Sequence, residues 1–428
     1  MISFEQALTT VRQQLQAAAR ELRTETVELL AGRGRVLADD LRADRDIPPF
    51  HRSTRDGFAV RSSDAAAVAA TLQVTGLARA GAPFAGRVAA GCAVEIMTGA
   101  PLPEGADAVA MVEYTREASP AAPGGSGPAR RVEISRAVGP GENVIRQGSE
   151  AAAGSIVLPR GRRLGPGEIG LAAAVGCCRL PVFARPHVAI LPTGDEVVPV
   201  DQRPDWFQIR NSNGAALAAQ VEAAGGAPRL LGAGPDNRDA LRTLVEEALD
   251  CDLLLLSGGI SVGKHDYVAE VLTDLGAEIY FQGVAIRPGK PLTFGRVRER
   301  FFFALPGNPV STFVTFEAFV RPALGVLGGA EFEPAAFLKA RLGKPLQQKT
   351  GLTVFMPARV APACADSNFA PAAGQQGEVA SDPVVELVGW QGSGDLVGLA
   401  QANCFLVAFP AQTDLAAGDW VDVLPKSW

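Results

Sequence analysis

The chain has 428 residues, 47% of them hydrophobic, and carries a formal net charge of −6. This length predicts roughly three domains with sizeable apolar cores. The acidic balance argues against a protein that binds nucleic acid through its overall charge. Its six cysteines show no metal-ligand spacing, which is typical of small buried side chains in a reducing cytosol. The sequence shows neither a targeting segment nor an apolar run of membrane length, so we expect a soluble, cytoplasmic protein without a membrane partner.

Two helices are expected near the N-terminus. Ser3 and Gln6 can form a capping box, and apolar residues then recur at helical spacing over Met1 to Arg20. A second helix is expected from about Leu29 to a point before Asp46. We expect both helices to pack against other elements rather than to carry chemistry.

Polar turns and short strands fill the next stretch of chain. Two prolines end any helix at Pro48, and the Asp56-Gly57 pair that follows is by itself a hairpin-turn signal. From Thr71 to Glu113 short strands alternate with glycine turns, and Met97 to Pro101 forms a polar loop between two of them. These residues alone favour an ordinary β-rich domain, and a short helix is expected further on around Gly165 to Val175.

Strands and helices then alternate between Pro186 and Gly329, which predicts an α/β domain with a parallel-rich sheet. Three polar turns follow its strands, at 193–196, 257–266 and 306–311. Ligands of such sheets bind outside the carboxyl ends of the strands, so we expect the three turns at one edge. Helices are expected over Asn213 to Ala224, after a capping Asp236, over Tyr267 to Leu275 and from Ser311.

The most distinctive of these turns reads SGGISVGKHD, from Ser257 to Asp266. Its glycines let backbone N–H groups approach a phosphate, its serines add hydroxyl donors, and the helix N-terminus adds positive potential. It is neither a Walker A loop nor a GxGxxG fingerprint. On the glycines alone, an ordinary strand-to-helix turn is an equal alternative. The candidate anion-binding residues here are Ser257, Gly258, Gly259, Ser261 and Gly263.

Beyond Gly329 the pattern changes to short strands separated by Gly/Pro turns. Val354-Phe355 and residues 384–387, 404–407 and 420–423 are the expected strands. A small β-barrel or β-sandwich fits this pattern.

Seven motifs, taken together and in order, carry a family resemblance. They are SxxDGFAV (53–60), IMTGAPLPEGADAV (96–109), TGDEVV (193–198), SGGISVG with Asp266, RPGKPLTFG (287–295), LPGNPVS (305–311) and WQGS (390–393). The chain resembles the molybdopterin molybdenumtransferases, the MoeA family that also includes the E domain of gephyrin. Each motif is weak alone, but the ordered set spans nearly the whole chain.

The resemblance implies four domains. They are a packing domain of residues 1–47 plus 146–184, a β-rich inserted domain of 48–145, a molybdopterin-binding α/β domain of 185–329 and a C-terminal β-barrel of 330–428. It also implies an elongated homodimer in which the α/β domain of one copy shares its site with the first half of the other.

The reaction that the resemblance implies joins adenylylated molybdopterin and molybdate into the molybdenum cofactor, with release of AMP. A molybdopterin adenylyltransferase would then supply the substrate. Magnesium prefers oxygen ligands and usually takes one or two carboxylates plus phosphate. Candidate magnesium ligands are Glu196, Asp236 and Asp266, with Asp195 beside them. Helix capping is the alternative role for Asp236 and Asp266. The resemblance assigns catalytic roles to Asp56, Thr98, Glu196, Asp236 and Asp266.

Molybdate is a tetrahedral dianion, which needs fixed positive charge and hydroxyl donors. The resemblance places Arg287, Lys290, Ser311 and Ser393 in that role, with Arg359 as the nearest candidate for an expected barrel arginine. Pro306 and Pro309 shape the same loop by fixing φ. A solvated basic turn is the alternative for Arg287 and Lys290, although the flanking prolines argue against it.

Five positions depart from the family pattern. Arg55 stands where methionine is common, Gly283 and Ile145 replace a common lysine and arginine, and Ser149-Glu150 replaces a usual Glu-Asp pair. The loss of two basic residues leaves open tungstate or another oxoanion as the substrate. The sequence also leaves open a non-catalytic molybdopterin-binding scaffold, and a nucleotide hydrolase or amidohydrolase that shares only the α/β domain.

Overall fold

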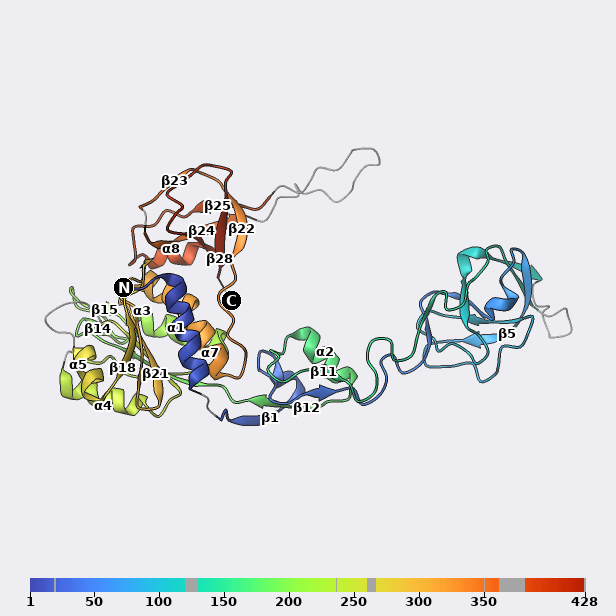
Figure 1. The fold of residues 1–428 in the computed structure, drawn as a ribbon, viewed down its shortest axis with the longest axis horizontal. Coiled ribbons are helices and arrows are strands. Elements are labelled where there is room, and N and C mark those ends of the chain that lie inside the picture. The colour runs from blue at the N-terminus through green and yellow to red at the C-terminus, as the bar shows by residue number, and fades with distance from the viewer. Residues whose placement is uncertain are drawn as a thin grey trace.

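The computed structural model describes residues 1–18, 21–119, 130–235, 237–259, 267–349, 351–361 and 382–426. Figure 1 shows an elongated molecule with a six-stranded α/β unit and a C-terminal barrel at one end. A second six-stranded sheet lies at the other end, and a slender middle part carries helix α2 (Pro166–Ala174). The expected multidomain α/β and β architecture is confirmed, while the exact domain boundaries stay a prediction.

The sheet of the α/β unit has the strand order β16-β13-β17-β21-β20-β18. Its first four strands run parallel: β16 (Ala227–Leu230), β13 (His187–Pro192), β17 (Leu253–Ser257) and β21 (Arg300–Leu305). The last two, β20 (Thr293–Val297) and β18 (Glu278–Gln282), add an antiparallel edge. The predicted sheet is therefore parallel around the candidate site and mixed at one side.

Helices cover both faces of this sheet, because its central strand is apolar on both sides. In β17, Leu253 and Leu255 belong to one core cluster, while Leu254 and Leu256 belong to the other. The first face carries α3 (Ser212–Ala223), α6 (Pro309–Thr315) and α7 (Arg321–Leu327), and the second carries α4 (Arg238–Ala248) and α5 (Tyr267–Asp274).

Two helix starts differ from the sequence prediction. Helix α6 begins at Pro309 rather than Ser311, because a proline suits the first helical turn, where its missing N–H costs nothing. Helix α4 is capped by Asn237, whose side chain accepts a hydrogen bond of 3.0 Å from the Ala240 N–H. The predicted cap, Asp236, lies outside the described residues.

The N-terminal helix α1 (Phe4–Ala17) has the predicted capping box between Ser3 and Gln6. It packs where the α/β unit meets the C-terminal barrel, because the centroid of the Phe4 ring lies 5.4 Å from that of Phe319 in the α/β unit and 5.8 Å from that of Phe355 in the barrel.

The second predicted helix is wrong. Its place is taken by a 3-10 turn (Leu29–Gly32) and β2 (Leu41–Arg42), and β1 (Thr24–Glu28) lies just before them. Strand β1 pairs with β12 (Arg179–Phe183), and β2 pairs with β11 (Ile156–Leu158). Threonine and valine in β1 favour a strand, and Gly34 adopts a φ of +77°, which ends the helical spacing.

The distal sheet unit, as we call the sheet at the far end, has the order β7-β4-β6-β5-β9-β8. Its strands are β4 (Gly57–Val60), β5 (Ala70–Ala78), β6 (Cys92–Ile96), β7 (Ala108–Met111), β8 (Thr115–Ser119) and β9 (Arg131–Ile134). The pair β3 (Arg52–Ser53) and β10 (Val144–Ile145) leads into it.

The C-terminal barrel is closed, as predicted, because β24 pairs with β26 as well as with β25. Its five strands are β22 (Leu338–Leu342), β24 (Thr353–Ala361), β25 (Val384–Leu387), β26 (Cys404–Ala408) and β28 (Trp420–Pro425). Helix α8 (Leu396–Gln401) and the pair β23 (Leu346–Gln347) and β27 (Asp414–Leu415) accompany them. Strand β19 (Ile286–Arg287) pairs with β24 and so joins the barrel to the α/β unit.

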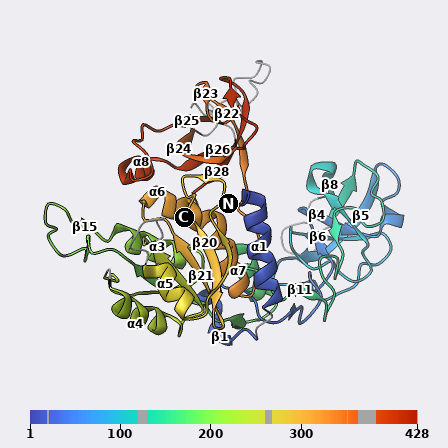
Figure 2. The same ribbon diagram turned by 60° about the vertical axis from the view of Figure 1, so that its left-hand side comes forward.

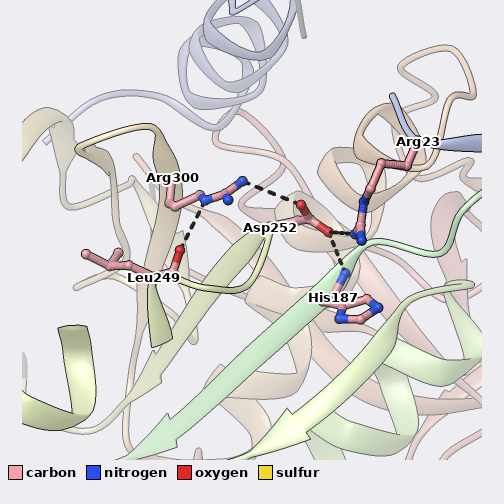
Figure 3. A network of polar contacts seen from close by, with 5 residues as sticks. All are labelled: Arg23, His187, Leu249, Asp252 and Arg300. Atoms are coloured by element: carbon pink, nitrogen blue, oxygen red, sulfur yellow. Dashed lines mark hydrogen bonds and ion pairs between the residues drawn. The ribbon is translucent and has the colours of Figure 1, made fainter. Parts of the chain in front are cut away.

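A buried carboxylate ties the amino ends of β13 and β17 to the N-terminal segment (Figure 3). Asp252 accepts hydrogen bonds from the His187 N–H at 2.8 Å and from Arg23 Nη2 at 3.1 Å, and Arg300 Nη1 lies 3.5 Å away. These groups sit at the opposite edge of the sheet from the candidate site.

Among the described residues, one helical stretch, Pro309–Leu327, is long and apolar enough to cross a membrane. Its apolar window is 78% buried inside the structure, as in a core helix.

Candidate functional site

The three predicted turns meet at one edge of the parallel sheet. Strand register aligns Pro192 with Ser257 and Ser257 with Leu305, so the chain leaves β13, β17 and β21 at the same level. The Thr193 N–H donates to the Ser257 carbonyl at 3.0 Å, and the Gly258 N–H donates to the Leu305 carbonyl at 3.2 Å. Backbone hydrogen bonds therefore connect the three turns at this edge of the sheet.

Asn213 holds two of these turns with one side chain. Its Nδ2 donates to Ser257 Oγ at 3.0 Å and to the Gly307 carbonyl at 2.7 Å. Ser257 is buried, so its hydroxyl is fixed in place. The sequence alone indicates only that Asn213 starts an alanine-rich helix, and a polar side chain at a helix start beside the ligand edge is the one hint of its role.

The glycines after β17 allow a close approach of backbone. Gly258 and Gly259 have φ values of +98° and +63°, and a Cβ on either one would lie 2.7 Å from an oxygen of Thr193. Thr193 is itself 5% exposed, and its buried Oγ1 has no hydrogen-bond partner among the described residues. The predicted residues Ser261, Gly263 and Asp266 lie outside the described part of the chain.

One of the predicted metal ligands lies at this edge. Glu196 is exposed, and its carboxylate folds back over Gly194, where a Cβ would collide with it. Magnesium usually takes one or two carboxylates and completes its shell with phosphate oxygens and water, so Glu196 beside a glycine-lined turn fits such an ion. Asp236 falls outside the described residues, and the residues that are described contain no cluster of three metal-ligating side chains.

The start of α6 is held by the C-terminal barrel. Asn308 Nδ2 donates to Ser393 Oγ at 2.9 Å, and the Val310 N–H donates to the Ser393 carbonyl at 2.9 Å. Pro306 accepts a hydrogen bond from Thr312 through its carbonyl, and Pro309 occupies the first helical turn. The loop after β21 is thus fixed from both sides, and Ser311 is buried in its first turn.

The predicted basic turn, which carries Arg287 and Lys290, packs against the C-terminal end of α6. A Cβ on Gly289 would lie 2.7 Å from Thr315 Cγ2, and Thr315 Oγ1 donates to the Ser311 carbonyl at 2.8 Å. Arg287 and Lys290 are exposed and form no ion pair within the described ranges. They remain available for an anion.

Arg359 lies elsewhere on the barrel. It is roughly 16 Å along β24 from Val354, the strand partner of Arg287, at about 3.3 Å per residue. Its Nη1 donates to the Gln401 carbonyl at 3.2 Å. The described contacts therefore do not bring Arg359 to the basic turn.

Asp56 and Thr98 lie together, but in the distal sheet unit. Asp56 Oδ1 accepts hydrogen bonds from the Thr98 N–H at 2.6 Å and from Thr98 Oγ1 at 2.9 Å. The first of these bonds contributes most, and both lower the pKa of the Asp56 carboxyl. Figure 1 places this unit at the far end from the α/β unit, so one chain does not bring Asp56 to Glu196.

The departures from the family pattern are accommodated by local structure. Gly283 has a φ of +83°, a conformation that a lysine would adopt only with strain. Ile145 pairs with Arg52 between β10 and β3, and Arg52 Nη2 bonds Glu150 at 3.1 Å. Arg55 is exposed beside Asp56.

Comparison with known families finds three matches along the chain. Residues 2–176 match the MoeA N-terminal region (domain I and II), and residues 189–325 match a probable molybdopterin binding domain. Residues 339–426 match the MoeA C-terminal region (domain IV).

Relatives match over nearly the whole chain. A molybdopterin molybdenumtransferase of Nostoc sp. is 35% identical and covers 94% of this chain and 88% of its own length. A Bacillus subtilis protein of the same name is 34% identical over 94% and 89%. Among solved structures, a molybdopterin biosynthesis moeA protein from Pyrococcus horikoshii covers 100% of both chains with 27% identity and a TM-score of 0.77.

Proposed function

Because the chain belongs to the MoeA family of molybdopterin molybdenumtransferases, enzymes of molybdenum cofactor biosynthesis, we propose that it inserts molybdate into adenylylated molybdopterin and releases AMP. The observation that carries this proposal is the convergence of three turns at one sheet edge, held by Asn213 and closed on one side by Ser393. We further propose that the enzyme works in the cytoplasm and receives its substrate from a molybdopterin adenylyltransferase.

The phosphoanhydride of the substrate would lie against the turn from Ser257 to Gly263. The backbone N–H of Gly259 would donate to its oxygens, because the Gly258 N–H is already bonded to the Leu305 carbonyl. Asn213 fixes Ser257 Oγ, so that hydroxyl is oriented before the substrate arrives. Attack of a water molecule on the phosphoanhydride would then free AMP and leave the other phosphate on molybdopterin.

Magnesium would be held by Glu196 together with Asp236 and Asp266. When bound, it would neutralise negative charge on the phosphate oxygens. Glu196 supports this role because its carboxylate folds over Gly194 at the same edge.

Molybdate would bind between the basic turn and the start of α6. Arg287 and Lys290 supply positive charge without a competing acid among the described residues, and Ser311 and Ser393 lie on the helix and the barrel that flank the loop. The rigid loop from Pro306 to Pro309 lowers the entropy lost when these groups close on a small dianion.

We also propose a homodimer in which Asp56 and Thr98 of one copy face the α/β edge of the other. In one chain the distal sheet unit that holds Asp56 and Thr98 lies at the opposite end of the molecule from the α/β unit (Figure 1), so the two parts can act at one centre only if two copies combine.

The test uses the purified protein with adenylylated molybdopterin, molybdate and magnesium, and measures AMP. We expect AMP release that depends on both ions and is lost in Glu196→Gln and Asp266→Asn. Release only with tungstate would assign a different oxoanion. Absence of release with any oxoanion, with tight molybdopterin binding, would identify a non-catalytic scaffold instead.

A further inference from the structure

A buried polar network joins two helices on one face of the α/β sheet. Helices α3 and α6 pack side by side on this face (Figure 2). Gln220 on α3 is 5% exposed, and its Nε2 donates to Glu317 Oε1 at 2.7 Å and to the Phe313 carbonyl at 3.4 Å. Phe313 belongs to α6, and Glu317 lies in the π turn (Phe316–Val320) that follows it. One amide therefore bridges two helices inside an apolar core.

The partner of this amide is a buried carboxylate. Glu317 is 2% exposed, and Arg321 balances its charge through Nε, which donates to Glu317 Oε2 at 2.6 Å, and Nη2, which donates to Oε1 at 3.1 Å. The buried Oε1 of Gln220 has no hydrogen-bond partner among the described residues. Apolar side chains of similar volume often stabilise a core as well as a polar network does. The network is therefore better explained by the geometry that it fixes than by stability.

Gln220 and Asn213 lie on the same face of α3. They are seven positions apart, which is nearly two helical turns, or about 10 Å along the axis at 1.5 Å per residue. Asn213 Nδ2 donates to the Gly307 carbonyl at 2.7 Å, just before α6 begins, whereas Gln220 donates to α6 and the π turn near the far end of that helix. Helix α3 is thus attached to the same neighbouring segment at two points.

Two points of attachment restrict a helix more than one does. Packed helices commonly slide past each other by small shear motions, and the bond between Asn213 and Gly307 alone would let α3 pivot about its start. A second bond two turns further on removes this freedom. Because Asn213 also donates to Ser257 Oγ, the position of α3 determines the spacing between the Ser257 turn and the loop 306–311.

We propose that Gln220 is a positioning residue, which fixes α3 against α6 so that Asn213 holds the Ser257 turn and the loop 306–311 at the spacing that the reaction needs. Its side chain lies inside the core and acts only through Asn213 and the loop. The inference rests on the proposed function in one respect, because it takes the loop 306–311 as part of the molybdate site.

The direct test needs no substrate. Gln220→Met keeps the length of the side chain but cannot donate to Glu317. Hydrogen–deuterium exchange of the free, full-length protein is followed in peptides that cover residues 306–314. We expect exchange there to rise by about fivefold, the effect of losing one hydrogen bond. Val245→Ala, which opens a cavity under α4 on the other face of the sheet, is the control and should leave these peptides unchanged.

A kinetic test uses the distance between the two points of attachment. Substitutions about 10 Å apart without a shared partner usually have independent effects. We expect Gln220→Met and Asn213→Ala each to raise the KM for molybdate in AMP release by about fivefold. The double variant should raise it by less than the product of the two factors, because either loss already frees the same loop. Val245→Ala should leave this KM within about twofold.

The outcomes distinguish this inference from the proposed reaction. Unchanged exchange at 306–314 in Gln220→Met, or a double variant whose two factors simply multiply, would each overturn the inference. Gln220→Asn, whose amide is one methylene shorter, carries the same prediction and serves if Gln220→Met does not fold. Raised exchange together with no AMP release by the wild type would uphold the role of Gln220 in fixing the loop and reject the reaction. AMP release with unchanged exchange in the variants would reject the role of Gln220 alone.

Discussion

Asn308 donates a 2.9 Å hydrogen bond to the hydroxyl oxygen of Ser393, and this bond joins the loop after β21 to the C-terminal barrel. The Val310 N–H reinforces it through the Ser393 carbonyl. Two units of the chain therefore meet at the position proposed for molybdate, and the contact depends on side chains from both.

The hydrogen bond between Asn308 and Ser393 predicts that variants at either residue bind molybdate more weakly. Ser393→Ala should raise the KM for molybdate by about fivefold, which corresponds to about 1 kcal/mol for one hydrogen bond. Asn308→Ala should raise the KM for molybdate by a similar factor. In the double variant the loss of binding free energy should be smaller than the sum of the two single losses. Steady-state AMP release measures this. Ser155→Ala, which removes a surface hydroxyl bonded to the Ala152 carbonyl, is the matched control. Additive losses in the double variant would contradict the coupling.

Asn213 should connect stability with substrate binding. Asn213→Ala removes both hydrogen bonds and should lower the free energy of unfolding by about 1–3 kcal/mol while raising the KM for adenylylated molybdopterin. Denaturant titration and steady-state kinetics measure the two effects. Ser3→Ala, which removes the cap of α1, should cost about 1 kcal/mol without changing KM. An equal rise of KM in both variants would show that stability alone is responsible.

Replacing Thr193 by valine should affect stability and substrate binding in opposite directions. Its buried Oγ1 lacks a partner among the described residues, and such a group costs about 1–3 kcal/mol. Thr193→Val should therefore leave the free energy of unfolding unchanged or raise it, while weakening substrate binding at the glycine turn. Thr193→Ser keeps the hydroxyl and should bind normally. Denaturation and calorimetric titration with AMP as the probe would measure both, and a strongly destabilised Thr193→Val variant would refute the assignment.

Asp252 should matter for folding and not for chemistry. Asp252→Asn removes the charge that Arg23 and Arg300 share (Figure 3), and because the Arg23 and Arg300 side chains are 60% and 25% exposed, we expect the free energy of unfolding to fall by about 1–2 kcal/mol. The exposed neighbour Asp250 provides the control, since Asp250→Asn should change stability by less than about 0.5 kcal/mol. Denaturant titration measures the loss. A changed KM in folded Asp252→Asn would place this network in the site instead.

The burial of Cys404 predicts a loss of stability at alkaline pH and protection of this thiol from labelling. Burial raises the pKa of the Cys404 thiol from 9.0 to about 11, so it stays protonated in the folded protein where an unfolded thiol would ionise. Stability should therefore fall as pH rises from 9 toward 11. Iodoacetamide should label the exposed Cys178 and leave the buried Cys404 unlabelled. Peptide mass spectrometry distinguishes the two, and early labelling of Cys404 would indicate an open barrel.

Much of the fold could be predicted because local patterns decide it. The apolar run of β17 and the capping box at Ser3 determine their elements without help from distant residues. The failure between Leu29 and Asp46 has the opposite origin, because β2 exists only through pairing with β11, which lies far along the chain. Spacing within one segment cannot reveal such partners.

In the candidate site, too, some features follow from the sequence and others depend on residues far apart in the chain. Turns that follow parallel strands could be placed at one edge, since topology alone brings them there. The roles of Asn213, Thr193 and Asn308 could not be foreseen, because each depends on which side chain faces which turn.

The separation of Asp56 from Glu196 along the molecule has a genetic consequence. In the proposed dimer each centre takes Asp56 from one copy and Glu196 from the other. A dimer of Asp56→Asn chains therefore lacks the first carboxylate in both centres, and a dimer of Glu196→Gln chains lacks the second. Mixed together, they would rebuild one intact centre in each heterodimer, so two dead proteins would complement each other to about a quarter of normal turnover.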